Sequence, residues 1–213
     1  MAYNVSPEQQ AFFEDKGYLI LRDVMSKEEA IDLQRWAQEV HDLPRTAETP
    51  WMPYEEINAS GQRVLCRTEN YANYHEQFNN LLRGKMMLSI LGQLAKEDML
   101  LFKEKSNSVP YVKHWNITAD ITILVNYKLA GSGGFSPHLD STAYTHVKNI
   151  KHLTILMAVD ASNMLNGGLE VVEGSHLMDI PIDRTDNCIE KSWVDSQKWV
   201  PVELETGANI LYP

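Results

Sequence analysis

The chain has little cysteine, no cluster of positive charge and no long apolar run, and each shortage excludes a class of protein. Only Cys66 and Cys188 are present, outside any CxxC pattern, so neither a disulfide framework nor a zinc ribbon is indicated. Lys and Arg number 19 against 29 Asp and Glu, and the formal net charge of −10 disfavours nucleic acid as a partner. No apolar run is long enough to cross a bilayer and residues 1–10 lack the features of a signal peptide, so a cytoplasmic location away from membranes is predicted.

What the chain does contain is the composition of a folded globular protein. Hydrophobic residues make up 44% and charged residues 23% of its 213 residues, far from the composition of disordered chains. This length supports one core, and no repeat or linker divides it. We therefore predict a single domain over residues 1–213, with a helix-rich part over 1–98 and a β-rich core over 99–213. The sequence alone sets no oligomeric state.

The first half of the chain carries the signals of helices and one short strand. A capping residue before proline and a later glycine predict a helix over residues 6–16, and a short apolar run predicts a strand over 18–21. A capping box and apolar residues at helical spacing predict a second helix over 26–40. Helical spacing returns over 71–95. Residues 44–64 contain several prolines, so we predict a loop there that borders a substrate pocket.

The second half changes to short strands separated by glycine-rich or polar turns. We predict strands at Met99–Lys103, Val125–Leu129, His152–Val159, Leu169–Val172, Trp199–Leu204 and Asn209–Tyr212. Many short strands of this kind favour a sandwich or barrel, and a jelly roll is the natural candidate. The predicted fold class is therefore mainly β with N-terminal helices, an α+β arrangement.

The most informative stretch runs from Gly131 to Tyr144 and contains the sequence His138-Leu139-Asp140 after a glycine-rich loop. In extended backbone, residues two apart point to the same side, so His138 and Asp140 can offer an imidazole nitrogen and a carboxylate oxygen to one ion. These are two of the three ligands of the 2-His-1-carboxylate triad of non-haem Fe(II) sites. The simpler alternative is a turn in which Asp140 caps the following segment. We predict that His138 and Asp140 are metal ligands and catalytic residues.

Two later segments add a family resemblance. Residues His152–Asp160, followed by Asn166–His176 with the sequence NGGLEVVEGSH, resemble the strand, turn and "GSH" segment of the phytanoyl-CoA dioxygenase family. With His138-Leu139-Asp140 and the N-terminal helices, the resemblance covers most of the chain. It implies a cupin-like double-stranded β-helix that carries Fe(II) and uses 2-oxoglutarate and O2. The implied function is a dioxygenase that hydroxylates or otherwise oxidises a small organic substrate, with acyl thioesters, amines, phosphonates and fungal secondary metabolites all left open.

Four residues are candidates for binding the cosubstrate 2-oxoglutarate. Lys103 and Lys105 alternate along a strand, so one of them can point toward the cosubstrate's carboxylate, although a solvated lysine at a sheet edge is an equal alternative. Tyr127 and Thr154 can line the cavity beside the metal loop, but aromatic and β-branched residues in strands also serve simply to pack. The histidine of the GSH segment is a supporting residue in the family, so the resemblance implies that His176 is not the third ligand.

The chain departs from the family at two places. Family members carry a distal histidine and then an arginine for the far carboxylate of 2-oxoglutarate, whereas residues 205–213 resemble only the beginning of that segment. We therefore expect a sequence that is incomplete at its C-terminus and binds Fe(II) weakly. The alternative is a catalytically inactive, dioxygenase-like binding protein. The second departure is residues 106–125, which interrupt a strand and are predicted to be an insertion, either a retained intron or a genuine loop.

Overall fold

The structure, a computed structural model, describes residues 2–103, 119–122, 125–127, 131, 133–144 and 151–213. It opens with α1 (Pro7–Lys16), β1 (Leu19–Leu21) and α2 (Lys27–His41). Both helices begin at a serine capping box, formed by Ser6 with Gln9 and by Ser26 with Glu29. Gly17 ends α1 in the left-handed conformation, with φ at 78°, where glycine is the favoured residue. The two helices and the strand predicted for this part of the chain are confirmed.

The helical region predicted over 71–95 is divided into three pieces. These are a 3-10 turn (Ala72–Tyr74), α3 (Glu76–Leu82) and α4 (Lys85–Ala95). The imidazole of His75 accepts a hydrogen bond from the Phe78 amide and so caps α3. Gly84 is the N-cap residue of α4. The apolar stripe of α4 is fully buried through Met87, Ile90 and Leu91, which is the face that the helical spacing predicted.

The loop predicted over residues 44–64 is wrong for its second half. Residues Met52–Ile57 form β2, which pairs antiparallel with β3 (Arg63–Glu69), and β6 (Val125–Asn126) completes a three-stranded sheet in the order β2-β3-β6. Pro53 misled the prediction, because proline usually interrupts strands. Here Pro53 lies on an edge strand, which is where sheets tolerate a residue without an N–H.

A second, five-stranded sheet has the order β1-β10-β7-β5-β4. Its further strands are β4 (Leu100–Lys103), β5 (Ala119–Thr122), β7 (Lys151–Met157) and β10 (Asn209–Tyr212). β10 pairs antiparallel with β1 and β7, whereas β5 pairs parallel with β7 and β4. β5 belongs to the segment predicted as an insertion, so this part of the segment lies inside the sheet. Residues 106–118 and 123–124 lie outside the described residues, and their origin stays a prediction.

The remaining elements are short. β8 (Glu170–Val171) pairs with β9 (Val200–Pro201), and α5 (Lys191–Ser196) lies between them in the sequence. Each predicted strand has a counterpart, although β6, β8 and β9 are only two residues long. The described strands form open sheets and do not close into a barrel. Within the described part of the chain, no helix combines the length and apolar character that a membrane crossing needs.

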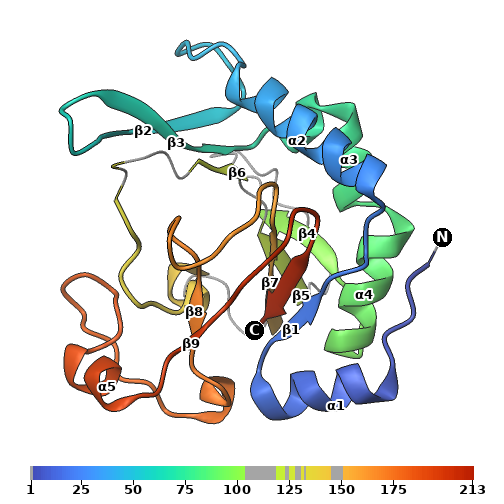
Figure 1. The fold of residues 1–213 in the computed structure, drawn as a ribbon, viewed down its shortest axis with the longest axis vertical. Coiled ribbons are helices and arrows are strands. Elements are labelled where there is room, and N and C mark those ends of the chain that lie inside the picture. The colour runs from blue at the N-terminus through green and yellow to red at the C-terminus, as the bar shows by residue number, and fades with distance from the viewer. Residues whose placement is uncertain (1, 104–118, 123–124, 128–130, 132, 145–150) are drawn as a thin grey trace, which may run out of the picture.

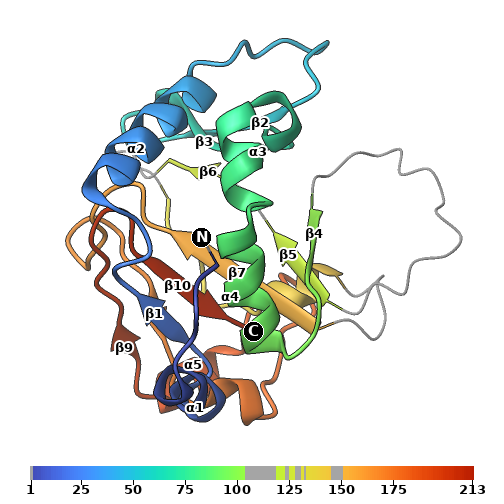
Figure 2. The ribbon, with the colours of Figure 1, turned by 90° about the vertical axis from the view of Figure 1, so that its right-hand side faces the viewer.

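Side-chain alternation along β7 and β10 separates two faces of the five-stranded sheet. Leu153 and Leu211 belong to the core that α2 and α4 complete, and Figure 2 shows α4 lying across this face. Ile210 belongs to a second apolar cluster, against which Leu156 packs. Since neighbouring residues along a strand point to opposite faces, the even-numbered residues of β7 and β10 face away from these helices. Figure 1 shows β8, β9 and their turns on that other side.

Candidate metal centre

The segment that carries His138 is held by two distant parts of the chain. On one side, the Ala59 amide donates to the Gly131 carbonyl at 3.0 Å, and the Gly133 amide donates to Glu56 Oε1 at 3.1 Å. Both partners lie at the end of the β2–β3 hairpin. On the other side, the Ile189 amide donates to the Pro137 carbonyl at 2.9 Å. The glycine-rich loop is therefore anchored on both sides before it reaches the two predicted ligands.

His138 and Asp140 face each other, although Asp140 begins a 3-10 turn (Asp140–Tyr144) and does not lie in the extended backbone that the spacing argument assumed. His138 Nε2 lies 3.3 Å from Asp140 Oδ1. His138 Nδ1 donates to the Ser136 carbonyl at 2.6 Å, which fixes the ring and assigns the other nitrogen, Nε2, to the site. The hydrogen bond to Asp140 raises the pKa of His138 in the absence of a metal ion. An ion bound at Nε2 would have to displace that proton.

The Asp140 carboxylate is bound from the sheet as well. Thr154 Oγ1, on β7, donates to Asp140 Oδ2 at 2.6 Å. Burial alone would raise the pKa of Asp140, but hydrogen bonds from His138 and Thr154, together with the charge of nearby His152, outweigh burial and lower the pKa. Asp140 is therefore an anion at neutral pH, which is the form that a metal ion needs.

Tyr212, on β10, also reaches this carboxylate. Burial is the main cause that raises the pKa of Tyr212, and the negative charge of Asp140 and a hydrogen bond to it add to the effect. The phenol therefore keeps its proton at neutral pH. Thr154 and Tyr212 are directly opposite each other in the antiparallel pair of β7 and β10, so both side chains lie on the same face of the sheet.

The donor set fits one face of a metal site. Two ligands at right angles, each about 2.1 Å from an ion, are about 3 Å apart, and Nε2 and Oδ1 are 3.3 Å apart. A neutral imidazole with one carboxylate is the donor combination of non-haem iron sites. Within the described ranges, no third His, Cys, Asp or Glu joins them to form a group of three.

The other predicted site residues lie in different surroundings. Tyr127 follows β6, and its hydroxyl donates to the Ala37 carbonyl of α2 at 3.4 Å. Its ring meets the ring of His41 edge-on, with centroids 5.0 Å apart. Of the two candidates whose side chains are described, the structure places Tyr127 against α2 and brings Thr154 to the two ligands. The backbone of Lys103 lies in β4, and Lys105 lies outside the described residues. A cosubstrate role for Tyr127 and the two lysines stays a prediction.

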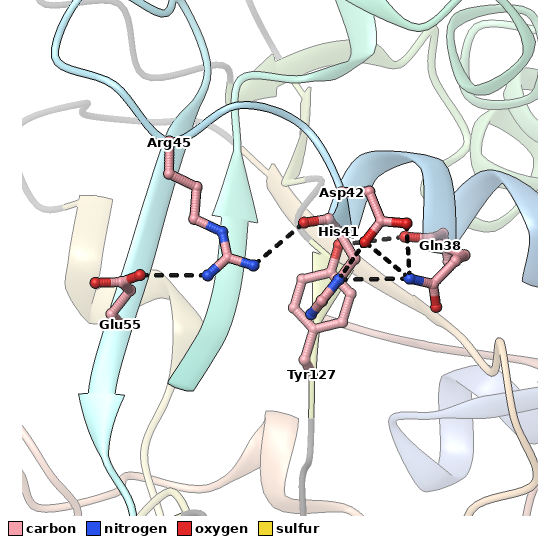
Figure 3. Close-up of polar contacts among 7 residues, drawn as sticks. Gln38, His41, Asp42, Arg45, Glu55 and Tyr127 are labelled. Atoms are coloured by element: carbon pink, nitrogen blue, oxygen red, sulfur yellow. Dashed lines mark hydrogen bonds and ion pairs between the residues drawn. The ribbon is translucent and has the colours of Figure 1, made fainter. Parts of the chain in front are cut away.

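Figure 3 shows the polar cluster that surrounds Tyr127 at the C-terminal end of α2. Gln38 Nε2 donates to both oxygens of Asp42 at 3.0 Å, and Arg45 forms an ion pair with Glu55 of β2 at 3.3 Å. The cluster joins α2 to the β2–β3 hairpin. The contacts of Tyr127 with Ala37 and His41 join the end of β6 to α2, which supports a structural role for Tyr127.

His176 lies away from the two ligands. Its Nε2 donates to the Glu14 carbonyl at the end of α1, at 3.1 Å, and its ring covers Gly17. The Gly174 amide donates to the Lys16 carbonyl at 2.8 Å in the same region. The structure thus gives the histidine of the GSH segment a partner on α1, and a supporting role at the metal site stays a prediction.

Two residues of the site were not found from the sequence. Tyr212 could have been found from alternation, because it is two residues after the core residue Ile210 and so shares the face of Thr154. Glu56 carried no signal, since its strand was predicted as a loop and its partner is the Gly133 backbone.

Comparison with known proteins identifies the family. A family model described as Phytanoyl-CoA dioxygenase (PhyH) matches residues 13–213. The chain belongs to the phytanoyl-CoA dioxygenase family. A 2-aminoethylphosphonate dioxygenase of Uncultured bacterium HF130_AEPn_1 is 30% identical over 206 residues, which cover 96% of this chain and 71% of that relative. The dioxygenase lolE1 of Epichloe uncinata is 29% identical over 211 residues, which cover 98% of this chain and 73% of that relative. Family membership makes this chain a dioxygenase-type protein.

This chain is similar in fold to several solved structures. EctD from S. alaskensis, in a crystal structure with 2-oxoglutarate and 5-hydroxyectoine, matches with a TM-score of 0.71 at 14% identity. The match covers 98% of this chain and 67% of EctD, and another structure of EctD contains bound Fe. This chain therefore shares the fold of a 2-oxoglutarate-binding, iron-binding protein, which supports the predicted jelly-roll class although the described strands remain open sheets.

Proposed function

We propose that this protein is an Fe(II)- and 2-oxoglutarate-dependent dioxygenase that oxidises a small organic substrate with O2. The observation that carries the proposal is the pair His138 Nε2 and Asp140 Oδ1, which lie 3.3 Å apart at the end of an anchored loop. The pair is the donor combination that non-haem iron sites use. Membership of the dioxygenase family and the iron and 2-oxoglutarate in EctD support the same cofactors.

The chain's own residues have separable tasks in this proposal. His138 and Asp140 hold Fe(II), and the hydrogen bond from His138 Nδ1 to the Ser136 carbonyl keeps Nε2 directed at the ion. When bound, iron with 2-oxoglutarate and O2 supplies the oxidation of an unreactive C–H bond. The protein supplies placement: the contacts of Glu56, Ala59 and Ile189 hold the loop, so the ligands need little reorganisation when the ion binds.

A small phosphonate is the first substrate to test. The relative at 30% identity is named for 2-aminoethylphosphonate, and a methylphosphonate hydroxylase of Gimesia maris is 29% identical over 196 residues. The other substrate classes that the sequence left open, which are acyl thioesters, amines and fungal secondary metabolites, should be tested beside the phosphonates. The inactive binding protein is not favoured, because both the relatives and the ligand pair indicate an oxygenase.

The proposal is tested by measuring succinate formed from 2-oxoglutarate with Fe(II), ascorbate and each candidate substrate. We expect substrate-dependent succinate above the level of Asp140→Ala and His138→Ala, which remove the two ligands. His176→Ala is the matched control, because it removes a histidine outside the pair. Equal succinate from the wild type and Asp140→Ala would overturn the proposal.

A further inference from the structure

The two oxygens of Asp140 have different partners. Oδ1 lies 3.3 Å from His138 Nε2, on the side of the proposed ion. Oδ2 accepts the hydroxyl proton of Thr154 at 2.6 Å, which is within the range of strong hydrogen bonds from hydroxyls to carboxylates. The carboxylate is therefore oriented before any ion arrives.

The hydroxyl of Thr154 that holds Asp140 lies in a buried part of the five-stranded sheet. Thr154 is 9% exposed and lies in β7, between β10 and β5. Tyr212 lies directly opposite it on β10, and the neighbouring Ile210 and Leu211 are completely buried. β7 is held on both sides by neighbouring strands, so the backbone of Thr154 has little freedom to move. The Thr154 hydroxyl therefore stays in place and resists rotation of the Asp140 carboxylate.

We propose that Thr154 is a positioning residue that holds Asp140 through Oδ2 and leaves Oδ1 as the single oxygen that binds the metal ion. This inference rests on the proposed function, because it concerns the ligand that Asp140 provides. In this proposal, one hydrogen bond from β7 holds the predicted metal-binding loop in place.

The same contact limits what else Thr154 can do. A threonine hydroxyl has one proton, and in this structure Asp140 accepts it. An ionised carboxylate of 2-oxoglutarate is only an acceptor, so Thr154 cannot donate to the cosubstrate and to Asp140 together. The proposal thus gives Thr154 a different task from the cosubstrate contact that its place in the sequence suggested.

The test compares two substitutions at one position. Thr154→Val keeps the shape and removes the hydroxyl, whereas Thr154→Ser keeps the hydroxyl. The probe is Mn(II) alone, with its binding constant measured by electron paramagnetic resonance on the full chain. We expect Thr154→Val to weaken binding about 10- to 100-fold, as for residues that orient metal ligands, and Thr154→Ser to stay within about threefold of the wild type. Tyr212→Phe should weaken binding less than Thr154→Val.

Asp140→Ala separates this inference from the proposed function. If Asp140→Ala abolishes Mn(II) binding while Thr154→Val binds as the wild type does, the positioning role is wrong and the metal site stands. If Asp140→Ala binds as the wild type does, the metal site is wrong.

In that second case, metal-free crystal structures still decide the positioning role. We expect the Asp140 carboxylate to turn in Thr154→Val and to keep its orientation in Thr154→Ser. An unchanged carboxylate in Thr154→Val overturns the positioning role.

Discussion

At the scale of single residues, the hydrogen-bond partner of a side chain, more than its residue type, decides whether the side chain belongs to the candidate metal centre. His138 uses Nδ1 for the Ser136 carbonyl and so directs Nε2 at Asp140. Tyr127, although it lies close to the metal loop in the sequence, uses its hydroxyl for the Ala37 carbonyl. The same chemical groups therefore serve the site or the scaffold according to the partner that each one meets.

The first prediction concerns the ionisation of Tyr127. Burial raises the pKa of Tyr127 from 10.0 to about 12. Because this folded-state pKa is above the unfolded value, the stability linked to Tyr127 is complete below pH 10 and is lost as the pH rises toward 12. In an absorbance titration of the folded protein, one more tyrosine should ionise near pH 12 in the wild type than in Tyr127→Phe. Identical titrations of the two proteins, with circular dichroism unchanged, would contradict the burial of this hydroxyl.

At the scale of elements, close contacts between distant segments hold the N-terminal helix and the metal loop in place. Gly17 ends α1 with a positive φ, and a Cβ there would overlap the ring of His176. The β2–β3 hairpin holds the glycine-rich loop through Glu56 and Ala59. Neither contact follows from the periodicity of a single element, because each joins positions far apart in the chain.

The second prediction is that Gly17→Ala destabilises the protein by about 1–3 kcal/mol in urea unfolding, because alanine is strained at positive φ and because His176 must move. His176→Ala alone should cost about 0.5–1.5 kcal/mol through its lost hydrogen bond. The double variant should cost less than the sum, since the steric part disappears. Strictly additive costs would show that the ring of His176 does not cover Gly17.

The third prediction concerns the hairpin. Glu56→Ala removes the acceptor of the Gly133 amide, whereas Glu56→Gln keeps a side-chain oxygen that accepts. Hydrogen exchange of the Gly133 amide should therefore become about 2- to 10-fold faster in Glu56→Ala and stay near the wild-type rate in Glu56→Gln. Equal exchange in all three proteins would mean that the hairpin does not hold the metal loop.

At the scale of the whole molecule, the sequence predicted features that depend on local patterns. The capping residue Ser6 before Pro7 and the capping box at Ser26 correctly predicted the first two helices. The proximity of His138 and Asp140 agrees with their spacing, but Asp140 begins a 3-10 turn where the spacing argument assumed extended backbone. Residues 52–57 were missed because Pro53 suggested a loop, although an edge strand tolerates proline. The placement of Thr154 opposite Tyr212 required strand register, which depends on pairing between segments distant in the sequence.

The most direct test of the account is the binding constant for Fe(II), measured without oxygen for the wild type, His138→Ala, Asp140→Ala and His176→Ala. We predict that the first two substitutions each weaken binding by more than about 100-fold, because each removes a ligand, whereas His176→Ala stays within about threefold of the wild type. If His176→Ala eliminates binding as completely as Asp140→Ala while the protein remains folded, the assignment of the metal centre to His138 and Asp140 is contradicted.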